Sequence, residues 1–213
     1  MILSFHPCFD TDVQIILGDR RLSPHDLDMI QKAEAIILPQ ACPQALYQAC
    51  QGSHSLTFPN HDMRFQYPGK MGQTLLFKDF KRPHPKTLLW SNVKEFQDAV
   101  PETGDFPHKP PFLIKEDKGH EAEGVCMVED ALSLSKALER LARKESSGRQ
   151  GFVTQDFIPS KGNALRAVII GKRIMTYWKR PGKPGQRITT IRRGAVIDHH
   201  WRQDLQEKGK AET

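Results

Sequence analysis

Residues 111–125 read PFLIKEDKGHEAEGV, and this stretch decides the expected fold. Its apolar run at Phe112–Lys115 predicts a strand that ends in a lysine, and the loop that follows contains Gly119 and Gly124. A lysine at a strand end holds a positive charge in a fixed place, and glycines let backbone N–H groups approach phosphate oxygens closely. This order of strand, lysine and loop suits a nucleotide clamp, although the loop is neither a GxGxxG nor a Walker A sequence.

Elements on both sides of this stretch predict one α+β unit that begins near Pro68-Gly69. In chain order we expect helix Lys70–Lys78, strand Thr87–Trp90, helix Asn92–Val100, loop Thr103–Pro111, strand Phe112–Lys115, strand Val125–Val128, a helix capped by Asp130, strand Phe152–Asp156, and strands Leu165–Ile170 and Arg173–Lys179. Gly171-Lys172 between the last two strands is the strongest hairpin signal of the chain. The stretch Arg202–Thr213 has mixed charge and little apolar content, which favours a solvated helix or a frayed end.

The first third of the chain alternates short apolar runs with helix signals. The expected strands are Ile15–Leu17, Ala35–Leu38 and Ser55–Phe58. Ser23-Pro24-His25-Asp26 predicts the start of one helix, and Pro43 and Gly52 mark the start and the end of another. This β-α-β-α-β order predicts a small parallel sheet covered by helices in a domain at residues 1–68, followed by a second domain at residues 69–213.

Polar groups further along the chain suit a nucleotide and a reacting phosphate. The strand Phe152–Asp156 offers backbone groups at a rigid position, where they can read the edge of an adenine. Arg166 and Arg180, on neighbouring strands of the hairpin, can both face one pocket and neutralise developing phosphate charge. Each of these residues, like Lys115, also has an ordinary structural interpretation as a solvated strand end or a member of an ion pair.

Together these features resemble the RimK-like branch of the ATP-grasp superfamily, which includes ligases that add glutamate to peptide carboxyl ends. The resemblance covers about Tyr67–Ala195, and the preceding third resembles the small domain ahead of an ATP-grasp core. The residues that match the family pattern, in its order, are Lys70, Pro85-Lys86-Thr87, Ile114-Lys115, Gly124-Val125, Gln155-Asp156-Phe157-Ile158, Gly162 with Arg166, and Arg180.

This resemblance implies that the chain binds ATP and that its parent activity joins a carboxylate to an amine through an acyl phosphate. The loop Gly119–Val125 is expected to cover the ATP phosphates. The implied nucleotide-binding residues are Lys70, Lys115, Gly119, Gly124, Val125, Gln155, Asp156, Phe157 and Ile158, and the implied catalytic residues are Arg166 and Arg180. The substrates besides ATP or ADP are expected to be small-molecule or peptide carboxylates and amines.

Three departures from the family pattern affect the expected chemistry. Ala164 stands where the pattern has an aspartate, and Glu121 and Glu123 stand in the loop where small residues are usual. The family's magnesium-binding acids end in an E-x-N motif, and none precedes Thr213. We therefore expect a C-terminally incomplete ATP-grasp core that lacks its last strands, with Mg²⁺ ligands outside this chain and no ligase turnover by the chain alone. A pared-down binding module is the alternative.

Composition narrows the class of protein. The chain has 213 residues, of which 38% are hydrophobic and 26% charged, as in globular proteins and unlike disordered ones. Its four cysteines form no CxxC pair, which argues against a structural zinc site and favours reduced thiols in the cytoplasm. No apolar run long enough for a membrane span and no signal peptide is apparent.

Two functions besides ligation stay open, and the formal net charge of +6 bears on the second. One is a non-catalytic nucleotide-binding or regulatory module. The other is a basic nucleic-acid-binding protein, which is disfavoured because no nucleic-acid-binding motif accompanies the charge. A homo-oligomer is left open as well.

Overall fold

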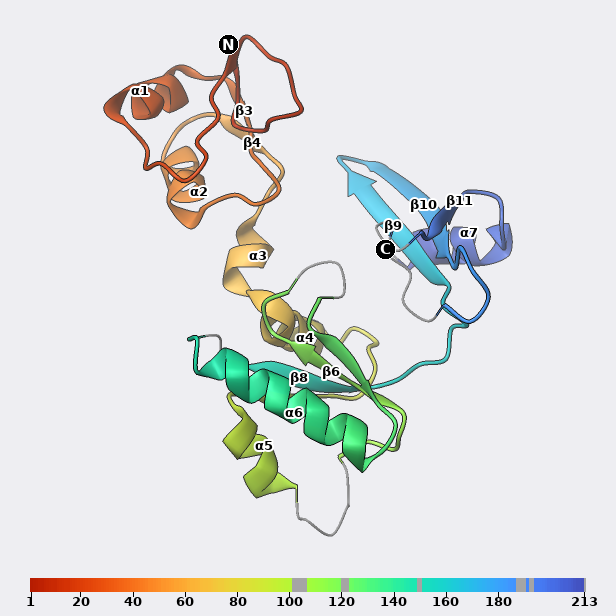
Figure 1. Cartoon of the computed structure of the whole chain (residues 1–213). Coiled ribbons are helices and arrows are strands. Elements are labelled where there is room, and N and C mark those ends of the chain that lie inside the picture. Colours follow the sequence, from red (N-terminus) through yellow and green to blue (C-terminus); the bar gives the residue numbers. More distant parts are fainter. Residues whose placement is uncertain (101–106, 120–122, 149–150, 187–190, 192–193, 213) are drawn as a thin grey trace. The chain divides into compact units, whose positions relative to one another are not determined.

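The computed structural model describes residues 1–100, 107–119, 123–148, 151–186, 191 and 194–212. The chain divides into two compact units, Met1–Pro68 and Gly69–Thr213. The first unit contains a parallel sheet and the second contains two antiparallel sheets, all accompanied by helices (Figure 1). The expected α/β class, with an α+β arrangement in the second unit, is confirmed. In the described part of the chain, no helix has the length and apolar character that a membrane crossing requires.

The first unit is a four-stranded parallel sheet with the strand order β2-β1-β3-β4. Its elements are β1 (Ile2–Ser4), β2 (Val13–Gln14), α1 (Pro24–Lys32), β3 (Ala35–Ile37), α2 (Gln44–Gln51), β4 (Leu56–Phe58) and α3 (Asp62–Gln66). Leu3, Ile30, Ile36 and Leu46 are almost completely buried and connect β1, β3, α1 and α2 in one core. Burying each such side chain stabilises the fold by about 1.5 to 3 kcal/mol.

The expected strand at Ile15–Leu17 is wrong. The strand in this region is β2, which begins two residues earlier and pairs with β1. The unpredicted strand β1 lies between β2 and β3 in the sheet. Because β1 is only three residues long, its burial comes from neighbours that are distant in sequence and not from a local pattern.

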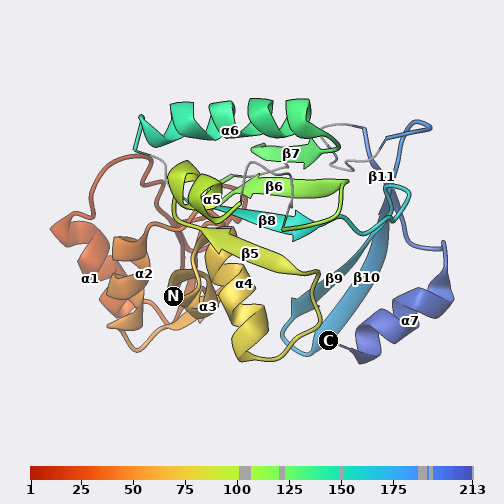
Figure 2. The ribbon, with the colours of Figure 1, turned by 90° about the horizontal axis from the view of Figure 1, so that it is seen from below.

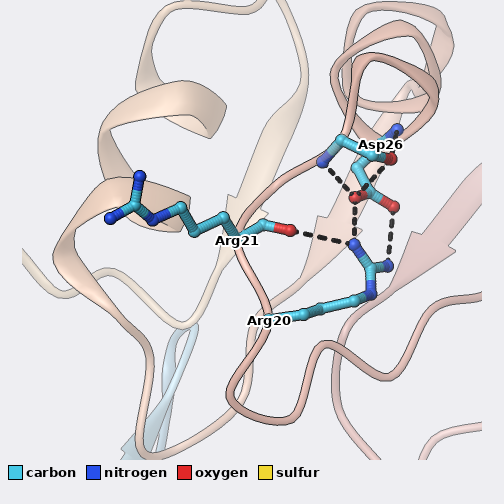
Figure 3. A network of polar contacts seen from close by, with 4 residues as sticks. Arg20, Arg21 and Asp26 are labelled. Atoms are coloured by element: carbon cyan, nitrogen blue, oxygen red, sulfur yellow. Dashed lines mark hydrogen bonds and ion pairs between the residues drawn. The ribbon is translucent and has the colours of Figure 1, made fainter.

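The start of α1 matches the sequence prediction closely (Figure 3). The Ser23 hydroxyl accepts a hydrogen bond from the Asp26 N–H, and the Asp26 carboxylate accepts one from the Ser23 N–H at 2.7 Å. Arg20 donates two hydrogen bonds to the same carboxylate, at 2.5 and 2.9 Å, and one to the Arg21 carbonyl. The Arg20 guanidinium therefore holds the pKa of the Asp26 carboxyl well below its ordinary value.

The first sheet of the second unit is antiparallel, with the strand order β5-β8-β6-β7. Its elements are α4 (Gly69–Asp79), β5 (Thr87–Trp90), α5 (Val93–Ala99), β6 (Phe112–Glu116), β7 (Val125–Val128), α6 (Ala131–Glu145) and β8 (Phe152–Asp156). Helix α6 lies along one face of the sheet and α4 lies against the other (Figure 2). Alternate residues of β6, Phe112 and Ile114, pack with Leu141 of α6 in the core, so the intervening residues of β6 face α4.

The second sheet of this unit has the strand order β11-β10-β9 and is followed by a helix. Its elements are β9 (Ala164–Ile170), β10 (Arg173–Arg180), β11 (Val196–Asp198) and α7 (Gln203–Ala211). The hairpin expected around Gly171-Lys172 is confirmed, whereas β11 was not expected. Helix α7 is only partly solvated, because Gln206 is buried and hydrogen-bonds the Thr176 hydroxyl at 3.3 Å.

Candidate functional site

A cavity of about 560 Å³ lies between α4 and the face of the β5-β8-β6-β7 sheet that α6 does not cover; we call it the α4 cavity. Its volume is in the range of small-molecule sites. It is lined by Lys70, Gln73, Thr74, Phe77, His84, Pro85, Thr87, Leu113, Lys115, Val125, Met127, Val153, Gln155 and Phe157.

Helix periodicity and strand register bring these residues together. Lys70, Gln73 and Phe77 follow one another at spacings of three and four, so they share one face of α4. On β6 the cavity face carries Leu113 and Lys115. Residues directly opposite in an antiparallel pair share a face, and Lys115 pairs with Val125 on one side and Val153 on the other, while Leu113 pairs with Met127 and Gln155.

A directed chain of hydrogen bonds crosses the floor of the α4 cavity. The Lys115 ammonium donates to the Gln155 side-chain carbonyl at 2.5 Å. The Gln155 amide donates to the Thr87 hydroxyl at 2.8 Å, and this hydroxyl donates to the Pro85 carbonyl at 2.8 Å. The chain therefore joins three separate parts of the family pattern: the strand entry at Pro85-Lys86-Thr87, the strand-end lysine and the glutamine of β8.

Both lysines of the cavity have perturbed electrostatics. Burial lowers the pKa of Lys115, and the nearby charge of Lys70 lowers it further. Burial also lowers the pKa of Lys70, while Asp117 and Glu116 act in the opposite direction. The Lys70 ammonium donates to the backbone carbonyls of Glu116 at 2.7 Å and Gly119 at 3.2 Å. Two partly desolvated ammonium groups at one cavity favour a polyanion, because an anion relieves their mutual repulsion.

The expected loop residues differ in their relation to the cavity. Val125 lines the cavity, whereas neither Gly119 nor Gly124 does. Gly124 has φ +75°, a conformation that glycine adopts readily, and its carbonyl accepts from the Glu116 N–H at 2.9 Å. Residues 120–122 of this loop lie outside the described residues, so the expected cover over phosphates stays a prediction.

The residues of the segment that is expected to read the adenine, Gln155–Ile158, differ in whether they line the cavity. Gln155 and Phe157 line the cavity, whereas Ile158 is 60% exposed and does not. The Asp156 N–H donates to the Lys86 carbonyl at 3.0 Å, so in this structure that group is engaged within the sheet. The Asp156 side chain does not line the cavity. Its carboxylate oxygen lies 2.6 Å from Nδ1 of the His108 imidazole. The remaining backbone groups of this segment stay candidates.

The expectation that Arg166 and Arg180 face one pocket is wrong. Arg166 pairs with Tyr177, three residues before Arg180, so strand alternation puts the two arginines on opposite faces of the hairpin. Arg180 donates to the Asp198 carboxylate at 2.7 Å, and its guanidinium lies 4.6 Å from the centre of the Trp201 ring. This Arg180–Asp198 ion pair holds the pKa of Asp198 down to about 2.

The described residues do not fit the magnesium site that the family resemblance implies. Across the described ranges, no three histidine, cysteine, aspartate or glutamate side chains come together as a metal site. The acids next to the glycine loop are engaged elsewhere, because Glu116 pairs with Lys144 and Arg140 on the α6 side and Asp117 accepts from the Met71 N–H at 2.8 Å.

Sequence reasoning assigned no role to several residues that line the cavity. Thr87 belonged to the matched pattern, but its link to Gln155 depends on the pairing of β5 with β8. Leu113 carried a usable signal, because it lies two residues before Lys115 and so shares its face of the strand. Val153 and Met127 can be assigned to the cavity only from the strand register, which pairs them with Lys115 and Leu113.

Comparison with known proteins identifies the family. The family model of the RimK-like ATP-grasp domain matches residues 70–208. A probable alpha-L-glutamate ligase from Pseudomonas fluorescens (strain SBW25) is 26% identical over 98 residues, which are 46% of this chain and 31% of that protein. The chain thus matches about a third of the length of this curated relative.

Solved structures share the fold at low sequence identity. A RimK domain ATP-grasp protein from Sphaerobacter thermophilus DSM 20745 aligns with TM-score 0.54 and 16% identity, over 83% of this chain and 72% of that chain. N5-carboxyaminoimidazole synthetase from Staphylococcus aureus, complexed with ADP, aligns with TM-score 0.66 and 12% identity, over 99% of this chain and 54% of that chain. Because the family model covers well over half of the chain, this protein belongs to the RimK-like ATP-grasp domain family.

Proposed function

We propose that this chain binds ATP or ADP in the α4 cavity and forms the nucleotide-binding part of an ATP-dependent carboxylate–amine ligase. The observation that carries the proposal is the chain of hydrogen bonds from Lys115 through Gln155 to Thr87. It fixes a cation at one place in a cavity that is otherwise lined mainly by apolar groups. Family membership and the glutamate ligases among the relatives support the class of reaction.

The proposed reaction has two steps, in both of which the protein aligns reactants and neutralises charge. In the first, a substrate carboxylate oxygen attacks the γ-phosphorus of ATP, the bond to the leaving ADP breaks, and an acyl phosphate forms. In the second, an amine attacks the acyl carbon, phosphate leaves, and the amine loses a proton. Lys115 and Lys70 serve the phosphates, and Phe157 and the apolar lining serve the base.

Calorimetric titration with ADP tests the nucleotide part of this proposal. Replacing Lys115 by alanine removes a charge-assisted contact in a partly buried site, which should cost about 1.5 to 3 kcal/mol, or at least about tenfold in affinity. Lys136→Ala is the matched control, because Lys136 is exposed on α6, on the other side of the sheet. The control should bind ADP as the wild type does.

Two outcomes count against the proposal in different ways. Equal ADP affinities for the wild type and Lys115→Ala would remove Lys115 from the site. No binding heat in any of the proteins would leave the nucleotide proposal without support. An ADP-release assay with excess magnesium tests the ligase step separately, and we expect no turnover from the 213-residue chain alone. Substrate-dependent turnover would show that the chain contains a metal site.

A further inference from the structure

The register of the β11-β10-β9 sheet sorts its side chains into two faces. Arg166 lies directly opposite Tyr177, and Ala164 lies directly opposite Lys179, without an intervening bulge. Paired residues of an antiparallel ladder share a face, and side chains alternate along each strand. Arg166, Tyr177 and Lys179 therefore project from one face, which we call the cationic face.

The opposite face is the packed one. Thr176 is buried and hydrogen-bonds Gln206 of α7, and the Trp178 ring lies 4.9 Å from the Trp201 ring in an edge-on contact. Arg180 completes this face with its ion pair to Asp198. Thr176, Trp178 and Arg180 alternate along β10 with Tyr177 and Lys179 of the cationic face, so these contacts all lie on the opposite side of the sheet.

The charge of the cationic face is not compensated by the strands that form it. The acid among the described residues of β9, β10 and β11 is Asp198, which pairs with Trp178 in the ladder and so lies on the packed face. Ala164 gives Lys179 an uncharged neighbour at the position where the ATP-grasp pattern has an aspartate. In the described part of the chain, neither Arg166 nor Lys179 forms an ion pair with a carboxylate.

The spacing of these groups suits an oxyanion. The Arg166–Tyr177 rung and the Ala164–Lys179 rung are two residues apart, which is about 7 Å along a strand. A guanidinium supplies paired donors, an ammonium supplies a point charge and a phenol supplies one more donor. Arg166 is exposed and Lys179 is half-buried, so both can reach a ligand. The His199 ring, 5.7 Å from the Tyr177 ring, borders the same face.

We propose that Lys179, together with Arg166 and Tyr177, forms an oxyanion-binding site on the cationic face, and that Lys179 replaces Arg180 as the second cation beside Arg166. The ligand is a phosphoryl or carboxylate group. The proposal rests on the proposed function for the origin of that group, since ligation through an acyl phosphate brings both kinds of oxyanion to the protein.

Amide NMR titrations of the full 213-residue chain test this site directly. Inorganic phosphate is the probe in one arm and acetate in the other, so the two arms distinguish a phosphoryl site from a carboxylate site. We expect shifts at Arg166, Tyr177 and Lys179 in at least one arm. Lys179→Gln, which keeps much of the side-chain length, should weaken that binding about fivefold or more. Lys172→Gln is the control, because Lys172 is an exposed lysine at the turn of the same hairpin.

The outcomes separate this site from the nucleotide proposal. Shifts confined to the cationic face that weaken in Lys179→Gln and persist in Lys172→Gln support the site, whether or not ADP binds. The absence of shifts at these residues in both arms, or equal affinities in wild type and Lys179→Gln, would overturn it. ADP binding that depends on Lys115 would leave the nucleotide proposal intact in that case. A dispersed spectrum of Lys179→Gln shows that the variant folds.

Discussion

The Gln155 side chain holds the Lys115 ammonium at 2.5 Å, and it does so while its own amide is held by Thr87. Lys115 and Gln155 lie on the same face of neighbouring strands, two residues apart in register, because Gln155 pairs with Leu113 and Val153 pairs with Lys115. Burial disfavours the charged form of a lysine unless polar groups hydrogen-bond to its ammonium. Gln155 is thus the neutral partner that keeps the position of Lys115 fixed and leaves its charge available.

Replacing Gln155 by alanine should weaken ADP binding by about three- to tenfold. The reason is that Lys115 loses the acceptor that orients it, at a cost of about 1 kcal/mol for one lost hydrogen bond. The loss should be smaller than that of Lys115→Ala, and the double variant should lose little more than Lys115→Ala alone, because the glutamine acts through the lysine. Calorimetry on the three variants measures this. Additive losses would mean that Gln155 contacts the nucleotide independently.

Replacing Thr154 by valine should destabilise the second unit by about 2 to 4 kcal/mol. The completely buried Thr154 hydroxyl accepts from the Trp90 indole at 3.0 Å and lies 2.9 Å from His108 Nε2. Valine leaves both partners buried and unsatisfied, at about 1 to 3 kcal/mol for each. Thr154→Ser keeps the hydroxyl and should cost only about 1 kcal/mol for the lost methyl group. Denaturant unfolding followed by tryptophan fluorescence compares the two variants, and similar losses would contradict the role of the hydroxyl.

Elements with a strong local signal were predictable from the sequence. The box of Ser23 and Asp26 at the start of α1 is made by adjacent residues, and the β9–β10 hairpin is set by Gly171-Lys172. By contrast, β1 and β11 are three residues long and gain their stability from partners distant in the chain. No periodicity can be read over three residues, so neither strand was visible.

The residues that form the site were predictable, except where the strand register determines the face on which a side chain lies. That Lys70, Lys115 and Gln155 meet follows from matched motifs, and the structure brings all three to one cavity. Arg180 shares a face with Arg166 only if its residue number differs by an even number from that of the residue that pairs with Arg166. That partner is known only once the register of the two strands is known. The turn of the Asp156 side chain toward His108 depends equally on pairing in space.

The Arg180–Asp198 ion pair should stabilise the second unit in a pH-dependent way. The pKa of Asp198 falls from its ordinary 3.8 to about 2 in the folded chain, chiefly through Arg180 and then through the N–H groups of His200 and Trp201. A carboxyl with a lowered folded pKa contributes stability above its unfolded pKa and loses it as the pH falls through the folded one.

We therefore expect the difference in free energy of unfolding between wild type and Asp198→Asn to be constant above about pH 5, to shrink between about pH 4 and pH 2, and to be lost below that. Denaturant titrations at several pH values measure this difference. Glu207→Gln is the control, since Glu207 is 70% exposed in its side chain and pairs with Lys210 at the surface. A wild-type advantage that does not change with pH would mean that the Asp198 charge is not what stabilises the fold.

Replacing Gly124 by alanine should destabilise the second unit far more than the same change at Gly171. Both glycines have positive φ, +75° and +58°, so alanine meets backbone strain of about 1 kcal/mol at either position. The surroundings differ, because a Cβ at Gly171 meets nothing within 4 Å, whereas a Cβ at Gly124 lies 2.5 Å from the Glu116 carboxyl carbon. Glu116 is held in place by Lys144 at 2.5 Å and Arg140 at 3.2 Å.

Gly171→Ala thus measures the backbone strain, and Gly124→Ala should cost about 2 to 4 kcal/mol because it adds the steric clash. Removing the obstructing side chain separates the two contributions. In the cycle formed by Gly124→Ala, Glu116→Ala and the double variant, the two changes should be coupled by at least about 1 kcal/mol, with the double variant more stable than the sum of single losses predicts. Denaturant unfolding of the four proteins gives the coupling. Additive losses would mean that the glycine is required for its backbone conformation alone and not for its approach to Glu116.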